Sequence, residues 1–184
     1  MAVNIQLEWT PNPSTLKYVV DRQLLPSGAV NFTEKAKAEE ISPLAKRIFD
    51  IRGVVGVMLG TNFVTVTKGD EGDWDELNDG VMETLDEHLT DNRPIVTGEW
   101  RAGGGNGGGG EVAERIRAFL EAEIRPAVAQ DGGDVLLDRF EDGIAYLMMH
   151  GSCSGCPSSV MTLKMGIENR LRELVPEVQE VVAV

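Results

Sequence analysis

The sequence contains few cysteines and no long apolar run. Two cysteines occur in 184 residues, too few for the disulfide framework of a small secreted protein. No apolar segment approaches the roughly 20 residues that cross a bilayer, so we expect no membrane partner. The N-terminus has neither the basic and apolar regions of a secretory signal nor the Arg- and Ser-rich character of a transit peptide. From these absences we expect a cytoplasmic protein.

Basic residues are also scarce. The chain has 17 Lys and Arg against 30 Asp and Glu, which gives a net charge of −13. An acidic surface repels nucleic-acid backbones and anionic lipids, so we expect no nucleic-acid partner. High solubility is the ordinary consequence of such a charge.

Glycine is concentrated in one segment. Residues 102–110 hold seven glycines in nine positions and no side chain able to join a core. Such a composition is typical of a flexible linker. It is not a phosphate-binding loop, because no Gly-Lys-Ser/Thr follows it. We therefore predict two domains, residues 1–101 and 111–184, joined by a tether of residues 102–110.

The first domain is predicted to be α+β. We expect a strand at residues 4–9, a turn at 10–13, a short helix at 14–20 and a second strand at 28–32. A helix should begin after Ser42 and Pro43, and residues 54–59 and 63–67 should form a hairpin. The last element is a helix over 74–89 capped by Asp73. The domain has no cysteine, and its one histidine is His88. A lone surface histidine is more often structural than catalytic, so we assign this domain no chemistry.

The second domain is predicted to have the order α-β-β-α-β. We expect a helix at residues 111–129, strands at 135–140 and 144–149, a helix at 158–175 and a last strand at 178–184. Asp131 and Asp134 flank a pair of glycines. We assign them to turn formation and helix termination rather than to a calcium or catalytic site.

The two cysteines, Cys153 and Cys156, lie where the second strand of this domain meets the following helix. Their spacing lets both sulfurs bind one metal ion or neighbouring irons of a cluster. The positive end of the helix favours thiolate near Cys156. Gly151 and Gly155 let backbone N–H groups approach sulfide or thiolate.

Two thiolates are half of a site, because tetrahedral zinc and [4Fe–4S] clusters each need about four ligands. His150 is a candidate third ligand. It ends a strand, however, where a histidine is more often packed or solvated than bound to metal. The simplest route to four thiolates is two chains related by a two-fold axis. A cluster held between chains is accessible to partners, which favours transfer.

Three segments of the second domain resemble the NifU-type C-terminal domain. They are residues 124–134, residues 151–159 with Gly-Ser-Cys-Ser-Gly-Cys-Pro-Ser-Ser, and residues 162–168. The first domain resembles the Nfu N-terminal domain through Thr10-Pro11-Asn12-Pro13, Ser42-Pro43-Leu44-Ala45 and residues 62–68.

The resemblance implies a late-acting iron–sulfur cluster carrier rather than an enzyme. Its cargo would be [4Fe–4S], with [2Fe–2S] not excluded by ligand count, and its ligands Cys153 and Cys156. The implied partners are an upstream assembly scaffold, apo iron–sulfur proteins and, when cluster-bound, a second copy of the chain. The first domain would recognise recipients or modulate release. The additional scaffold and ferredoxin-like domains of longer nitrogen-fixation proteins are absent from the sequence, which favours carriage over assembly.

Two alternatives stay open. A dimeric zinc site would use the same thiolates. A thiol–disulfide oxidoreductase also places Cys-x-x-Cys between a strand and a helix, although it usually needs a longer βαβ framework. Copper binding is not supported by Met148, Met149, Met161 and Met165, because methionine at such positions more often fills a core.

Overall fold

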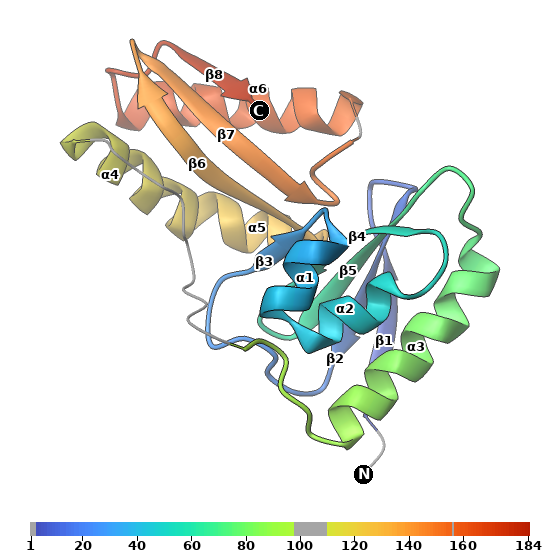
Figure 1. Cartoon of the computed structure of the whole chain (residues 1–184). Coiled ribbons are helices and arrows are strands. Elements are labelled where there is room, and N and C mark those ends of the chain that lie inside the picture. The colour runs from blue at the N-terminus through green and yellow to red at the C-terminus, as the bar shows by residue number, and fades with distance from the viewer. Residues whose placement is uncertain (1–2, 98–109, 156) are drawn as a thin grey trace. The chain divides into compact units, whose positions relative to one another are not determined.

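The structure, a computed structural model, describes residues 3–97, 110–155 and 157–184. The chain divides into two compact units, Met1–Ala102 and Gly103–Val184 (Figure 1). The predicted tether lies outside the described residues except for Gly110. Within the described ranges, no helix is both long and apolar enough to cross a membrane.

The first unit contains a five-stranded antiparallel sheet. Its strands are β1 (Ile5–Trp9), β2 (Thr15–Val20), β3 (Val30–Phe32), β4 (Val54–Leu59) and β5 (Phe63–Lys68), and their order is β1-β2-β5-β4-β3. The predicted hairpin is present as β4 and β5, and Gly60 N donates to Phe63 O at 2.8 Å to close it. β-Branched residues dominate both strands, which suits a pleated sheet.

Three helices complete this unit: α1 (Lys35–Ile41), α2 (Pro43–Phe49) and α3 (Trp74–Thr90). Both predicted caps are present. Ser42 Oγ accepts from Ala45 N at 3.1 Å, and Asp73 Oδ1 accepts from Asp75 N at 3.0 Å. Buried residues of the helices and sheet form one core, which includes Leu16, Tyr18, Leu44, Ile48, Leu59, Val64, Val66, Val81 and Leu85.

The prediction of a helix at residues 14–20 is wrong, because these residues form β2. Thr15, Tyr18 and Val20 are β-favouring residues, and β2 pairs with β1 on one side and β5 on the other. The pairing of β2 with β1 and β5 depends on the assembled sheet, and the local sequence pattern of residues 14–20 does not reveal it. The expectation that His88 lies on the surface is also wrong, since its side chain is 0% exposed.

The second unit follows the predicted order α-β-β-α-β. It consists of α4 (Glu111–Phe119), a π-helical turn η1 (Leu120–Ile124), α5 (Arg125–Gln130), β6 (Gly133–Glu141), β7 (Ile144–Gly151), α6 (Pro157–Leu174) and β8 (Glu180–Ala183). β7 is the central strand, antiparallel to β6 and parallel to β8. Both units are thus α+β, as predicted.

The predicted helix at 111–129 is interrupted by η1. Pro126 follows this turn and has no N–H to donate, so regular helical hydrogen bonding cannot continue through it. α4 and α5 pack along β6, and α6 packs along β8 (Figure 1). Alternate residues of β7 are buried, and with the helices they form a separate core.

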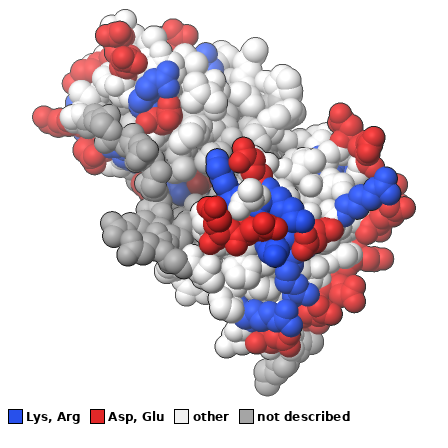
Figure 2. Space-filling model, in the orientation of Figure 1, with Lys and Arg blue, Asp and Glu red and all other residues white. Residues whose placement is uncertain are grey.

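Charged side chains of both signs are mixed on the face drawn in Figure 2. Several basic groups are paired with carboxylates, such as Lys35 with Asp50 at 2.5 Å and Arg47 with Glu87 at 2.6 Å. On this face basic side chains therefore lie next to acidic ones.

Candidate functional site

Cys153 lies in the turn that joins β7 to α6. Gly151 and Gly155 have positive φ values, +61° and +80°, which non-glycine residues rarely adopt. Cys153 N donates to His150 O at 3.2 Å, and the Ser154 N–H and hydroxyl both donate to Gly151 O, at 3.1 and 2.8 Å. The chain therefore reverses tightly here, and the position of Cys153 is fixed by backbone hydrogen bonds.

The Cys153 side chain is 7% exposed and belongs to the core of the second unit. It lies over Gly133, the first residue of β6. A Cβ atom at position 133 would be 2.2 Å from Cys153 Sγ and 3.1 Å from Cys153 N. Glycine at 133 therefore leaves the space that Cys153 Sγ occupies, and a side chain there would displace the sulfur from this position.

The environment of Cys153 favours the thiol over the thiolate. The pKa of Cys153 is raised to about 11, mainly by burial and also by the charges of Asp131 and Asp134, while the hydrogen bond with Ser152 acts in the opposite direction. Sequence reasoning missed this effect, because it considered only the helix terminus near Cys156. A metal or cluster bound to this sulfur would have to displace its proton.

Cys156 lies outside the described residues, so the distance between the two sulfurs is not part of the geometry. Pro157 is the first residue of α6, as the sequence predicted. His150 is partly buried on β7 opposite Asp134. Burial lowers the pKa of His150, the nearby Asp134 opposes this, and Arg125 adds to it. Among the described side chains, no three His, Cys, Asp or Glu residues gather closely enough to hold a metal.

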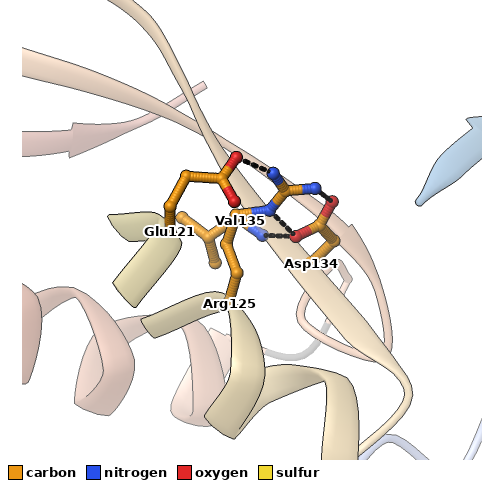
Figure 3. A network of polar contacts seen from close by, with 4 residues as sticks. All are labelled: Glu121, Arg125, Asp134 and Val135. Atoms are coloured by element: carbon orange, nitrogen blue, oxygen red, sulfur yellow. Dashed lines mark hydrogen bonds and ion pairs between the residues drawn. The ribbon is translucent and has the colours of Figure 1, made fainter. Parts of the chain in front are cut away.

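A buried ion pair joins Arg125 to Asp134, the residue after Gly133 (Figure 3). Arg125 and Asp134 are 7% and 3% exposed. Arg125 Nε donates to Asp134 Oδ1 at 2.7 Å, and Nη2 donates to Oδ2 at 2.9 Å. Glu121 accepts from Nη1 of the same guanidinium, and Asp134 Oδ1 also accepts from Val135 N at 2.9 Å. The pair joins α5 to the start of β6.

The prediction that Asp134 serves turn formation is wrong, because Asp134 is the second residue of β6 and the partner of Arg125. Asp131, by contrast, does cap α5, followed by Gly132 with φ +75°. Burial alone would lower the pKa of Arg125, but hydrogen bonding and charge from Asp134, with Glu121, outweigh it and raise that pKa. The spacing of Glu121 and Arg125 could have revealed their contact, whereas the pairing with Asp134 depends on the fold.

The second unit is an α+β domain with a cysteine-bearing turn between a strand and a helix, and residues 116–182 match the NifU-like domain. Residues 5–92 match the family described as scaffold protein Nfu/NifU N terminal. The chain belongs to the Nfu family of iron–sulfur cluster scaffold proteins, as the resemblance predicted.

Curated relatives support this assignment. The chain is 42% identical over 179 residues to the human NFU1 iron-sulfur cluster scaffold homolog, mitochondrial, covering 96% of this chain and 70% of that protein. It is 40% identical to NifU-like protein 4, mitochondrial, of Arabidopsis thaliana, covering 96% of this chain and 64% of that protein. A solution structure of a NifU-like protein from Saccharomyces cerevisiae is 23% identical, with a TM-score of 0.48, over 53% of this chain and 87% of that one.

The expectation of a cytoplasmic protein is wrong. The human and Arabidopsis relatives are both named as mitochondrial proteins. The chain spans between 60% and 70% of the length of such relatives.

Proposed function

We propose that this protein carries an iron–sulfur cluster, in its [4Fe–4S] form, and transfers it to apo iron–sulfur proteins. The cluster is cargo, received from an upstream assembly scaffold. The observation that carries the proposal is the position of Cys153 in the strand–helix turn of the unit that matches the NifU-like domain. The family consists of scaffold proteins, which agrees with a role in cluster handling rather than catalysis.

In this proposal Cys153 and Cys156 supply the protein ligands. The chain has only two cysteines, whereas a [4Fe–4S] cluster is usually held by four thiolates. Two chains that each provide the pair complete the set across a two-fold axis. Such a shared cluster can leave when either partner is replaced by a recipient, which suits transfer.

The turn itself supports this role. Hydrogen bonds within the turn and the contact with Gly133 hold the Cys153 backbone in one place, so little ordering is needed at this residue when a cluster binds. The sulfur is buried in the single chain. Loading therefore requires the Cys153 side chain to turn outward from Gly133 toward the cluster.

We also propose a division of labour between domains at residues 1–101 and 111–184, with residues 102–110 as a flexible tether. The first domain recognises recipients or modulates release, and the tether keeps it near the cluster domain. Each unit has its own buried core, so residues 111–184 can be tested alone. Equal transfer rates from this fragment and from the whole chain to every recipient would contradict a role for the first domain.

Anaerobic reconstitution with iron and sulfide tests the central proposal. We expect a dimer with about four irons, four sulfides and a broad visible absorption band. Cys153→Ser should abolish or strongly weaken that band, while Ser27→Ala, an exposed change in the first unit, should retain it. An unchanged cluster in Cys153→Ser would disprove the ligand assignment. Zinc without a cluster would instead favour the structural metal site, and thiol exchange without metal would favour a redox role.

A further inference from the structure

The part of the exposed face of α6 between Met161 and Asn169 lacks charge, whereas Arg170, Arg172 and Glu173 are exposed toward its C-terminal end. Met161, Thr162, Met165, Gly166 and Asn169, which we call the α6 stripe, are all exposed. By the 3.6-residue period they lie together on one side of the helix. Met161 and Met165 are 64% and 60% exposed. Ile167 and Leu171, at 1% and 0% exposure, mark the opposite side, which faces the core.

This distribution departs from that of an ordinary surface helix. The side of an amphipathic helix opposite the core normally carries the charged residues, and this chain is 26% charged. Charged residues of α6 lie beside the stripe or follow it toward the C-terminal end, and most of them pair within the chain. Arg172 contacts Glu168 at 3.0 Å, and Arg170 contacts Glu173 at 2.9 Å. The stripe is therefore an uncharged surface bounded by neutralised charges.

Gly166 is a second and independent sign of contact. A Cβ atom at this position would meet nothing within 4 Å, so packing inside the chain gives no reason for glycine. Glycine in a helix interior destabilises the helix. A missing side chain on an exposed helix face does, however, let another backbone approach closely. Methionine beside it adds an adaptable apolar contact.

We propose that the α6 stripe is the surface through which two copies of this chain associate to share a cluster. This inference rests on the proposed function and adds the contact surface to it. The stripe begins one turn after Pro157, the first residue of α6, and therefore adjoins the cysteine turn. Two chains that bring their cysteine turns together across a two-fold axis also bring together the helices that follow.

Charge selects a second copy as the occupant. Two chains of net charge −13 repel each other, so a stable contact between them needs a surface without acidic residues. A two-fold contact uses the same patch on both partners, and an uncharged stripe is complementary to itself. A nucleic acid or an anionic membrane would need basic residues, and the stripe has none.

The test compares cluster-loaded proteins under anaerobic conditions by sedimentation velocity and iron content. Met161→Glu with Met165→Glu should raise the dimer dissociation constant at least about tenfold, because like charges would face each other. Cluster content per chain should fall with it. The matched control, Val55→Glu with Val184→Glu, adds the same charges at two exposed apolar residues outside α6 and should leave both values unchanged.

Two further variants separate contact from folding. Met161→Lys with Met165→Lys should fail to dimerise alone, but an equimolar mixture with the Glu variant should recover dimer and cluster. Gly166→Gln should raise the thermal stability of the helix yet weaken the dimer several-fold. A variant that is more stable but associates less cannot be explained by misfolding.

Each outcome has one meaning. A wild-type chain that binds no cluster overturns the proposed function. A wild-type loaded dimer with equally dimeric and equally loaded stripe variants overturns only the α6 contact. Unchanged loading together with slower delivery to recipients also overturns it and assigns the stripe to recipient proteins. Loss of dimer and cluster in both charged variants, with recovery in the mixture, supports it.

Discussion

The two units of this chain are both α+β, but they use buried polar residues differently. In the first unit two of the buried polar groups secure the ends of helices: Ser42 caps α2, and His88 Nε2 donates to Pro94 O near the end of α3, at 3.0 Å. In the second unit a buried ion pair and a glycine–sulfur contact converge on one strand–helix turn. The two units thus share a fold class but place these buried contacts differently: at helix ends in the first unit, and beside the candidate site in the second.

This difference between the units shows that the candidate site around Cys153 depends on β6 as much as on the cysteine turn. Gly133 provides the space for Cys153 Sγ, and the next residue, Asp134, fixes that end of β6 to Arg125 of α5. The sequence of the first unit has no cysteine and therefore no counterpart of this glycine–cysteine contact. Substitutions that affect one unit and spare the other can test this contrast.

The largest effect is expected for Asp134→Ala. It leaves the Arg125 guanidinium buried without its main partner, and breaking a buried pair typically costs about 3–5 kcal/mol. We expect the second unit to unfold at a lower denaturant concentration while the stability of the first unit is unchanged. Far-UV circular dichroism follows the unfolding of the chain, and hydrogen exchange measures the stability of each unit separately.

The control for that prediction is Asp138→Ala. Asp138 pairs with Arg139 at 2.6 Å, but both side chains are more than one-third exposed, and exposed pairs contribute about 0–1 kcal/mol. Equal destabilisation by the two substitutions would contradict a special role for the buried pair.

Gly133→Ala should have the next largest effect. The added methyl group would overlap Cys153 Sγ, so the Cys153 side chain must rotate away or the turn must shift, and overpacking of this kind costs about 1–3 kcal/mol. We expect lower stability of the second unit and faster alkylation of Cys153, measured by mass spectrometry of peptides. Gly166→Ala, which meets no neighbour, is the matched control and should stabilise by roughly 0.5–1 kcal/mol. Unchanged alkylation in Gly133→Ala would refute the contact.

Ser42→Ala tests the first unit in the same way. The substitution removes the cap of α2 and the bond from Ser42 Oγ to Ile95 O at 2.5 Å. Loss of a helix cap costs about 1 kcal/mol. Denaturant unfolding should show this loss in the first unit only, and cluster binding by the second should be retained. Impaired cluster binding would show that the units are coupled.

The smallest expected effect is a pH dependence from His88. Burial lowers the pKa of His88 from 6.5, the bond to Pro94 O opposes this, and the charges of Arg47 and Arg93 add to it, with Asp91 acting against them. The unfolded chain therefore takes up the proton first. The stability associated with neutral His88 is present above about pH 6.5 and declines as the pH falls toward the folded-state pKa.

His88→Gln isolates this contribution from the carboxylates that also titrate in acid. The variant should show a flatter decline in the free energy of unfolding of the first unit between about pH 7 and pH 5. Parallel curves for wild type and variant would exclude His88 as the source.

The sequence predicted those parts of the fold that have local signals. Asp73 with the apolar spacing of α3, and the Gly60–Asn62 connection of the hairpin, act within a few residues and were identified. The segment of β2 was predicted incorrectly because its conformation depends on two neighbouring strands. α1 was not predicted, since neither Glu34 nor its neighbours provide a side-chain cap.

The candidate site was predictable to the same extent. Cys153 and its turn follow from spacing, glycines and Pro157. Gly133 and Asp134, in contrast, are 20 and 19 positions before Cys153 in sequence, and only the pairing of β6 with β7 brings them to the turn. The ion pair with Arg125 likewise requires the packing of α5 on β6. Contacts between elements are not visible in local patterns.

The position of Cys153 over Gly133 has a consequence for the empty protein. A sulfur that is 7% exposed is poorly accessible to peroxide, and thiols without thiolate character oxidise slowly. Under the proposed function, this burial protects Cys153 from oxidation between one delivery and the next loading. Gly133, which leaves space for the sulfur, contributes to that protection.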